Sequence, residues 1–542
     1  MVRIVSAEEA VSYVRPGDTL LIGGSGGGHA VPDALLAALG KRFLETGAPA
    51  SLTALHPVGL GDGVDQGAGH LAHEGLLSRV VSGTYVNSPK ISDLVMAGKI
   101  EGWTLPQGAL SQLMREMAAG RPGLLTRTGL HTFVDPRLGG GRQSPAKTEE
   151  LVELETFRGE EYLFYKPFHV NVCFLRGTTA DEDGNVTMEQ EAVFLEMLSE
   201  AQATRRCGGI VIVQVKRMAR RGTLPPKHVK IPGILVDMIV VDPDQRQTYL
   251  TEYSPSYAGE LRTPITDSNK MPLDARKIIA RRAALELFPG AICNLGSGIS
   301  TGIANVAIEE GVLDRVCLTN EQGLIGGAPA SGNDAGAASN YSAMVDQPYQ
   351  FDFYDGGGLD LAFLSFAELD RDGNVNVSRF GKRIVGPGGF INISQNARSL
   401  IFSGTFTAGA CDIDWKDGRI RIGQDGPHFK LVQQVQQITY SGRYGLERGQ
   451  RVLYITERAV FRLSPQGVEL IEIAPGVDIE RDIVARMGFR PAIADNLIEM
   501  DARIFRPEPI GLTQHLDGRS RRPQPVALTK VDAPSLEVAC DA

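Results

Sequence analysis

The chain has few cysteines for its length, and they are scattered. Six occur among 542 residues, at positions 173, 207, 293, 317, 411 and 540, with no Cys-x-x-Cys pair. Secreted domains that depend on disulfides are dense in cysteine, and cysteine-based zinc sites use closely spaced pairs. The pattern therefore argues against a disulfide framework or a cysteine metal site, and it predicts a reducing compartment.

The sequence also lacks long apolar runs and an excess of positive charge. Runs such as residues 209–215 and 231–241 have the length of strands, whereas a membrane-spanning helix needs about 20 apolar residues. The formal net charge of −9 argues against a general nucleic-acid-binding protein. Residues 1–9 carry charges too early and too often for a signal peptide. We therefore expect a cytoplasmic protein that binds neither membranes nor nucleic acids and holds anionic ligands through local groups.

Several catalytic and cofactor motifs occur only in weak form. Residues 23–27 satisfy G-x-S-x-G, the hydrolase nucleophile elbow, but they follow the first strand and lie in a glycine cluster where the match has little specificity. Residues 296–302 place the third glycine of a dinucleotide-binding fingerprint one position late, which disfavours a nicotinamide cofactor. His70 and His73 have no third ligand nearby in the sequence, so no metal site is predicted.

What the sequence does contain is a pattern that occurs twice. Residues 16–26 read as a turn, an apolar strand and a Gly-rich turn, and residues 289–298 have the same layout. An Asp-x-Asp-Gly-Asn-Val segment follows in each half, at 181–186 and 370–375. Both segments lack the spacing and the final Glu of a calcium loop, so they predict hairpin turns. The repetition indicates two related domains.

Apolar strands that alternate with helical patterns indicate the class of these domains. Residues 210–213 and 234–241 are almost wholly apolar, as in strands buried on both faces, and residues 192–203 and 275–287 have helical patterns. This alternation predicts an α/β protein with two related open α/β domains in tandem. We expect an N-terminal domain over 1–254, a linker over 255–274, a C-terminal domain over 275–504 and an extended Arg/Pro-rich tail over 505–542.

The most informative segment is residues 318–327, which places Glu321 on a Gly-rich turn directly after an apolar strand. An ionised carboxylate can act as a covalent nucleophile without a base to activate it, and no Ser/His or Cys/His pair stands nearby. The structural alternative is a solvated glutamate in a polar turn.

A second Gly-rich turn, residues 386–390, follows a short apolar strand. Small residues would let backbone amides approach a substrate oxygen closely, as an oxyanion hole requires. The alternative is an ordinary tight turn. Residues 296–302 could likewise present backbone N–H groups to a phosphate where a helix begins.

These motifs, in this order, resemble the family I coenzyme A-transferases, and most closely the long single-chain group that includes propionate/acetate and acyl-CoA:acetate/3-ketoacid CoA-transferases. Further matching segments are residues 105–108, 129–137, 402–409 and 452–461, so the resemblance covers roughly residues 3–500. It implies two related α/β domains with the active site at their interface. It also implies a homo-oligomer, either a tetramer or a dimer.

By this resemblance Glu321 is the nucleophile that attacks an acyl-CoA and passes through a covalent glutamyl-CoA thioester. The remaining implied roles are the oxyanion donors Gly388 and Gly389, the acyl or acceptor contact Gln107, and the CoA-binding residues Gly296, Ser297, Gly298, Ile299 and Ser300. Coenzyme A is then a substrate, with small carboxylates such as acetate, propionate, butyrate, lactate or acetoacetate, and no permanently bound cofactor or metal is expected. Two other functions remain open: an acyl-CoA thioesterase or other hydrolase, and a non-catalytic CoA-binding protein.

Overall fold

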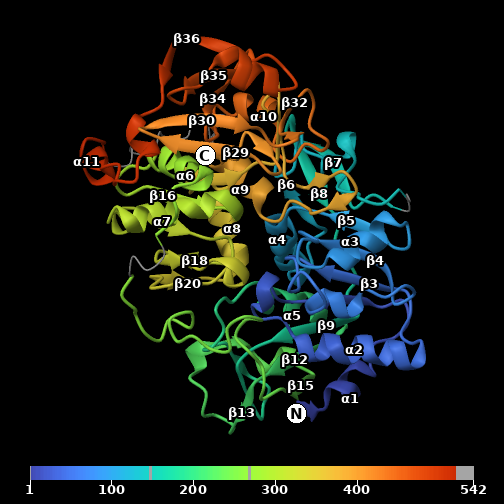
Figure 1. The fold of residues 1–542 in the computed structure, drawn as a ribbon. Helices are drawn as coiled ribbons and strands as arrows, with labels where there is room; N and C mark the ends of the chain where they lie inside the picture. The colour runs from blue at the N-terminus through green and yellow to red at the C-terminus, as the bar shows by residue number, and fades with distance from the viewer. Residues whose placement is uncertain (1, 146–148, 266–269, 521–542) are drawn as a thin grey trace, which may run out of the picture.

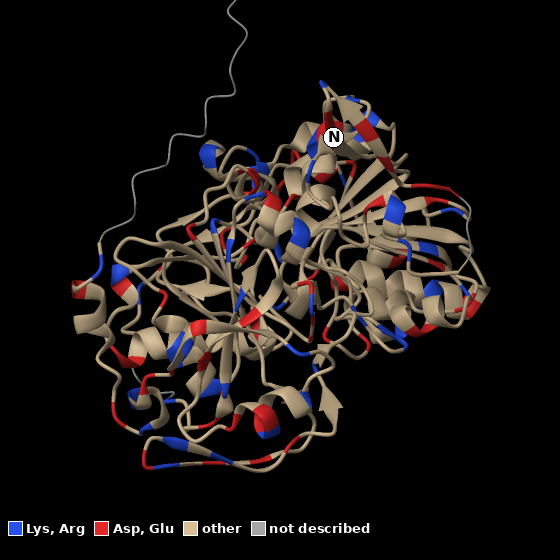
Figure 2. Ribbon diagram, turned by 90° about the horizontal axis from the view of Figure 1, so that it is seen from above, with Lys and Arg blue, Asp and Glu red and all other residues tan. Residues whose placement is uncertain are grey.

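The computed structural model describes residues 2–145, 149–265 and 270–520, which form two α/β domains (Figure 1). The predicted tandem α/β architecture is confirmed. No helix in these described ranges is long and apolar enough to cross a membrane. Acidic and basic residues are interspersed along the ribbon of both domains (Figure 2).

The N-terminal domain is built on an eight-stranded sheet in which every neighbouring pair is parallel. Its strands, in spatial order, are β1 (Arg3–Val5), β15 (Met238–Val241), β12 (Ile210–Val215), β9 (Val172–Arg176), β2 (Thr19–Ile22), β3 (Leu52–His56), β4 (Leu77–Ser82) and β5 (Glu101–Thr104). Side chains alternate between two cores: Leu20 and Ile22 face one, and Leu21 faces the other.

Helices cover both faces of this sheet, which explains why its strands are apolar throughout. Helices α1 (Ala7–Val11), α2 (Asp33–Thr46) and α3 (Pro89–Met96) pack on the Leu20 face, and α4 (Gln107–Ala118) and α5 (Met197–Arg206) pack on the Leu21 face.

The C-terminal domain contains a mixed ten-stranded sheet, and its central strands β17, β16, β22, β27 and β33 are parallel. The full order is β21 (Ala343–Met344), β18 (Leu324–Ile325), β17 (Cys317–Thr319), β16 (Ile292–Leu295), β22 (Leu361–Ser365), β27 (Ser399–Ser403), β33 (Arg451–Ile455), β34 (Ala459–Ser464), β35 (Gly467–Ile473) and β36 (Ala492–Glu499). Helices α6 (Ala275–Ala284) and α7 (Gly302–Glu309) lie on one face, and α8 (Gln347–Asp355) and α9 (Phe390–Asn396) lie on the other.

The two predicted hairpin turns are present and are built alike. They connect β10 (Thr179–Asp181) to β11 (Val186–Thr187), and β23 (Glu368–Asp370) to β24 (Val375–Asn376). In each, the first Asp carboxylate accepts two backbone N–H groups and the Asn side chain of the same turn. The repeat seen in the sequence is therefore also a repeat of local structure.

Three expectations differ from the structure in their bounds. The strand expected over 234–241 begins only at Met238, because Gly233–Leu235 form a 3-10 turn. The helix expected from residue 192 begins at Met197. The tail was expected to be extended from residue 505, and this is wrong up to residue 520. Phe505, Leu512 and Leu516 are buried against the α6 and α7 side of the sheet, and α11 (Leu512–Asp517) is helical. Residues 521–542 lie outside the described ranges.

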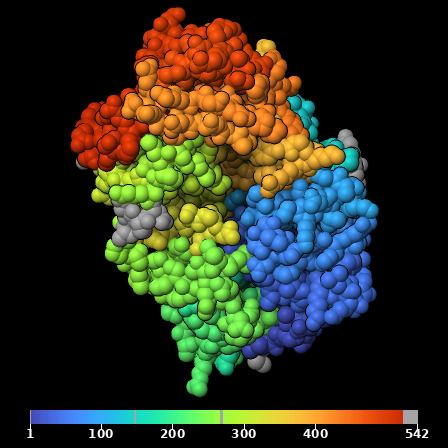
Figure 3. All heavy atoms as spheres, viewed as in Figure 1, coloured from blue at the N-terminus to red at the C-terminus, as the bar shows by residue number. Residues whose placement is uncertain are grey.

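The domains meet along α4, which packs against α8 and α9 (Figure 1). Arg115 and Asp352 form a two-bond ion pair across this contact, with both N···O distances at 2.6 Å. Gln112 donates to Asp355, and the Gly108 amide donates to Asn392. The surface is hollowed where the blue N-terminal segments face the yellow and orange C-terminal segments (Figure 3).

Candidate active site

Glu321 stands at the carboxyl end of β17, on a turn that its neighbours close. The Asn320 amide donates to the Leu324 carbonyl, and the Leu324 amide donates back to the Asn320 side chain at 3.0 Å. Gly323 has φ +107°, and a Cβ there would lie 2.0 Å from the Val345 carbonyl oxygen. Only glycine fits this position, so the sequence forces the chain to reverse directly after Glu321.

The Glu321 carboxylate is half-buried, and the hydrogen bonds that it accepts from described side chains are long. Asn294 Nδ2 lies 3.4 Å from one oxygen and Gln322 Nε2 lies 3.5 Å from the other. Burial raises the pKa of Glu321 above its usual value, and these weak donors only partly oppose that shift. A poorly solvated carboxylate is a more reactive nucleophile than one stabilised by strong donors.

Asn294 also belongs to a network of buried polar side chains. Asn294 Nδ2 also lies 3.4 Å from the Tyr354 hydroxyl, which is 2.8 Å from Thr319 Oγ1 and accepts from Gln350. None of these three residues, Asn294, Thr319 and Tyr354, was predicted from the sequence. The available signal was a polar residue within each of two short apolar strands, β16 and β17.

Glu321 opens into a cavity of about 410 Å³ that lies between the domains. Residues of the N-terminal domain that line it include Ser25, Gly26, Gly27, Val58, Thr84, Asn87 and Gln107. Those of the C-terminal domain include Gly296, Ser297, Thr301, Asn320, Glu321, Gln322, Gly388, Gly389, Phe390 and Ile393. The structure therefore brings the predicted nucleophile, the second Gly-rich turn and Gln107 to one place.

The two candidate oxyanion donors behave differently. The Gly388 amide donates to the Gly83 carbonyl of the other domain at 2.8 Å. The Gly389 amide has no hydrogen-bond partner among the described residues, and a Cβ on Gly389 would lie 3.4 Å from Glu321 Cγ. In this conformation Gly389 is available to a substrate oxygen, whereas Gly388 fastens the turn to the N-terminal domain.

Gln107 is the first residue of α4, and its backbone N–H donates to the Gly388 carbonyl at 2.9 Å. A Cβ on Gly388 would lie 3.7 Å from Gln107 Oε1. The side chain therefore faces the same turn from the opposite domain.

Of the five residues assigned to CoA by resemblance, Gly296 and Ser297 line the cavity. Gly298, Ile299 and Ser300 form the following 3-10 turn, and Ser300 is buried with its Oγ 3.4 Å from Ser365 Oγ. These three residues lie directly before α7 and are not among the residues that line the cavity.

The dense glycines at 23–28 are explained by the close approach of other segments, and at Gly27 the approaching segment belongs to the C-terminal domain. A Cβ on Gly27 would lie 2.2 Å from the carbonyl oxygen of Asn333, and one on Gly26 would lie 2.5 Å from Asn87 Oδ1. His29 at the end of this turn is buried and bonds the Ala335 carbonyl through Nε2 at 3.1 Å. The turn therefore lies where segments of both domains approach its backbone closely, beside the cavity.

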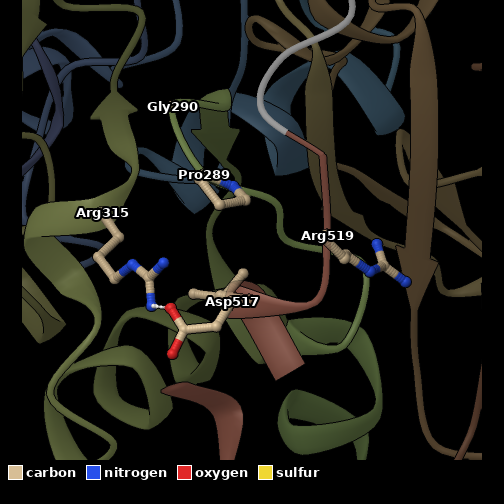
Figure 4. Close-up of a pocket in the computed structure, with 6 residues that line it drawn as sticks. Pro289, Gly290, Arg315, Asp517 and Arg519 are labelled. Atoms are coloured by element: carbon tan, nitrogen blue, oxygen red, sulfur yellow. Dashed lines mark ion pairs between the residues drawn. The ribbon is translucent and has the colours of Figure 1, made fainter. Parts of the chain in front are cut away.

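A second cavity, of about 510 Å³, lies beside α11 and away from Glu321 (Figure 4). It is lined by Pro289, Gly290, Arg315, Leu516, Asp517 and Arg519, and Arg315 is paired with Asp517 at 2.8 Å. It contains no nucleophile, and Arg519 donates to the backbone carbonyls of Glu286 and Leu287. Chemistry therefore favours the Glu321 cavity, although this one is larger.

No group of His, Cys, Asp or Glu side chains within the described ranges could hold a metal ion. His70 instead lies 3.2 Å from the Asp33 carboxylate. The five cysteines that the structure describes are free thiols.

Comparison with known proteins identifies the family. A model described as coenzyme A transferase matches residues 4–242. Caffeate CoA-transferase of Acetobacterium woodii is 45% identical over 94% of this chain and 99% of its own length. The crystal structure of the acyl-CoA transferase YdiF apoenzyme from Escherichia coli O157:H7 is 44% identical, with a TM-score of 0.90 over 94% of this chain and 97% of that one.

The chain belongs to the coenzyme A-transferase family. The similarity extends, at lower identity, to human succinyl-CoA:3-ketoacid coenzyme A transferase 2, which is 27% identical over 91% of this chain. The predicted family is thus confirmed, and membership extends through both domains.

Proposed function

We propose that this CoA-transferase works by a ping-pong reaction through Glu321, with small carboxylic acids as donors and acceptors. The observation that carries the proposal is the Glu321 carboxylate: it is half-buried between two domains, and the free amide of Gly389 lies beside it. The relatives named for acetate and caffeate support acyl-CoA and carboxylate substrates. A YdiF structure described as a thioester complex with CoA supports a covalent intermediate.

In the first half-reaction a Glu321 oxygen attacks the thioester carbonyl carbon, and the C–S bond breaks to give a mixed anhydride and CoA thiolate. The Gly389 N–H is placed to stabilise negative charge that develops on the carbonyl oxygen. The thiolate then attacks the Glu321 carbonyl carbon, and the first carboxylate leaves. The acceptor carboxylate reverses these steps, so no ATP, metal or water is consumed.

Water must be kept from both intermediates, since hydrolysis would waste the activation. The cavity is lined by segments of both domains, and the Gly83–Gly388 hydrogen bond and the α4–α8 contact hold them together. This arrangement favours transfer over thioester hydrolysis.

Intact-protein mass spectrometry after incubation with acetyl-CoA, with no acceptor added, tests the proposal. We expect one CoA adduct, which maps to the peptide carrying Glu321, disappears when acetate is added and is absent from Glu321→Gln. Free CoA accumulating without an adduct would instead establish a hydrolase. An adduct that persists in Glu321→Gln would show that another residue is the nucleophile.

A further inference from the structure

Asn392 lies where three helices of the two domains meet. It is the third residue of α9, and its side chain is fully buried. Its Oδ1 accepts from the Gly108 amide in the first turn of α4 at 3.1 Å. Its Nδ2 lies 3.1 Å from each oxygen of Asp355, the last residue of α8. Both polar ends of this side chain therefore have partners on the other two helices.

The Gly108 amide fixes the direction of the Asn392 side chain. A backbone N–H can only donate, so the oxygen of Asn392 must face Gly108 and its NH₂ group must face Asp355. This holds in either protonation state of Asp355, because a protonated carboxyl group still has an acceptor oxygen. A Cβ on Gly108 would lie 2.5 Å from Asn392 Nδ2 and 2.4 Å from Phe351 Cδ1, so only glycine lets α4 approach this closely.

Each of the three helices carries one part of the candidate active site. Helix α4 begins at Gln107, which lines the cavity. Gly389 caps the start of α9 and lies beside Glu321. Helix α8 carries Tyr354, which lies 3.4 Å from the Asn294 side chain next to Glu321. The junction therefore connects parts of the site that belong to different helices.

The junction is also close to the amide that we assign to the substrate oxygen. Asn392 follows Gly389 by less than one helical turn of 3.6 residues. A Cβ on Gly389 would lie 3.4 Å from Glu321 Cγ and 3.5 Å from Phe351 Cζ of α8. The start of α9 thus packs against both the carboxylate side chain and α8. A shift of α9 relative to α8 would change the distance between the Gly389 amide and Glu321.

We propose that Asn392 is a positioning residue that holds the Gly389 amide beside the Glu321 carboxylate, because it ties the first turn of α9 to α4 and to the end of α8. This rests on the proposed function and assigns a residue that acts on that same site without touching the substrate. Its effect should appear in the chemical step, since negative charge on the thioester oxygen develops only as Glu321 attacks.

The test measures the acyl-CoA half-reaction by rapid quench, over a series of acetyl-CoA concentrations and with no acceptor. Asn392→Leu keeps the approximate size of the side chain and removes both hydrogen-bonding ends. We expect the saturating rate of adduct formation to fall by about 10²-fold, the effect of misplacing a reacting group by about 1 Å. The acetyl-CoA concentration that gives half of this rate should not change, because the lost interaction acts only in the transition state.

Asn396→Leu is the matched control. Asn396 ends the same helix and donates to the same Asp355 oxygen at 3.0 Å, and its second bond goes to the Asn392 carbonyl. Neither bond reaches α4. Both variants should melt at a lower temperature than the wild type, whereas only Asn392→Leu should lose rate. This pair separates the positioning of Gly389 from a general loss of stability.

A reciprocal exchange gives a second test that does not require Asn392→Leu to fold. Asn392→Asp keeps an acceptor facing Gly108 but places two carboxyl groups opposite each other, so the rate should fall. Adding Asp355→Asn again places an amide opposite a carboxyl group and should recover most of the lost rate. Recovery of this kind is expected from a hydrogen bond and not from packing alone.

Two results would overturn the proposal while leaving the transferase mechanism intact: a saturating rate in Asn392→Leu no lower than in Asn396→Leu, or no recovery in the reciprocal exchange. A wild-type protein that forms no adduct at Glu321 would instead overturn the proposed function, and this inference with it.

Discussion

The two domains use the same strand pair for different purposes. In the N-terminal domain β2 and β3 are parallel, with Leu21 opposite Leu55. In the C-terminal domain β16 and β17 are parallel, with Asn294 opposite Thr319. Each pair leads into a Gly-rich or polar turn at the carboxyl ends of its strands, where open α/β sheets place their ligands. At this place in the sheet the first half has an apolar pair of residues and the second half has a polar pair.

The difference separates scaffold from chemistry. Leu21 and Leu55 are fully buried and belong to one apolar core. Asn294 and Thr319 are also buried, but they bond Tyr354 and, through Asn294, Glu321. The strand end in the first half is closed by His56, whose Nδ1 lies 2.6 Å from the Val58 carbonyl and whose pKa falls to about 4 on burial. Since this imidazole stays neutral at neutral pH, the strand end in the first half carries no charge there, and the acidic group that the first half adds to the cavity lining is Asp62, on a later loop.

Exchanging the two residue types across the repeat should show the largest effect. Asn294→Leu removes a side chain that fixes the position of the Glu321 carboxylate, and we expect kcat to fall by about 10²-fold, as when a reacting group is misplaced by about 1 Å. The reciprocal change, Leu21→Asn, buries an amide in an apolar core and should lower stability by about 2–4 kcal/mol with little change in kcat. Steady-state kinetics and thermal melting separate the two outcomes. Equal loss of activity in both variants would show that the halves contribute alike.

The pH dependence of adduct formation should sharpen the same contrast. Glu321 must be ionised to attack, so the rate of the acyl-CoA half-reaction should fall about tenfold per pH unit below the pKa of Glu321. Burial raises that pKa, so the fall should begin above the usual glutamate value of about 4.3. Asn294 lowers it, so the falling limb should move to higher pH in Asn294→Leu. Rapid-quench measurement of the adduct between pH 4 and 8 checks both, and an unmoved limb would remove Asn294 from this role.

The sequence predicted what depends on local pattern. Apolar runs and glycine punctuation predicted the tandem α/β domains, and the position of Glu321 after a strand singled it out as the residue that we propose as nucleophile. The turn at 386–390 was recognised because glycines there permit close approach. Each of these features is visible in a short window of residues.

Features that depend on tertiary contact were not predictable in this way. Asn294 and Tyr354 meet only because β16 and α8 pack together, and the sequence separates them by 60 positions. The Gly388 amide was assigned to substrate, but its partner Gly83 lies in the other domain. The C-terminal segment looked extended because Arg and Pro dominate it, yet its few apolar residues cover the α6 and α7 face. Such contacts follow from the fold and not from periodicity.

The twin hairpin turns predict effects of similar size in the two halves, with a somewhat larger effect in the second. Asp181 and Asp370 are buried, and each accepts three hydrogen bonds within its own turn. Replacing either with Ala should cost about 1.5–3 kcal/mol, the range for hydrogen bonds to a charged group. Asp370 also accepts from the Val435 amide at 3.3 Å, so Asp370→Ala should be the more harmful. Thermal melting of both variants gives the comparison, and a clearly larger loss in Asp181→Ala would contradict it.

The smallest expected effect concerns the side chain that packs against the first glycine of the Gly-rich turn in each half. A Cβ on Gly23 would meet Glu200 Oε2 at 2.7 Å, whereas one on Gly296 would meet the Leu364 side chain at 2.8 Å. Glu200 is fully buried, and neither of its oxygens has a hydrogen-bond partner among the described residues. Burial, and then the neighbouring Glu196, raises the pKa of Glu200 well above its usual value.

Glu200 is therefore protonated in the folded chain at pH values where the unfolded chain has already ionised it. The folded state binds more protons there, so stability should fall as pH rises above the unfolded value of about 4.3. Glu200→Met makes this position apolar, like Leu364, and should stabilise the protein by about 1–3 kcal/mol at pH 8 and by less at pH 5. Melting temperatures at both pH values test this. Equal gains at the two pH values would show that burial of the polar group matters and its ionisation does not.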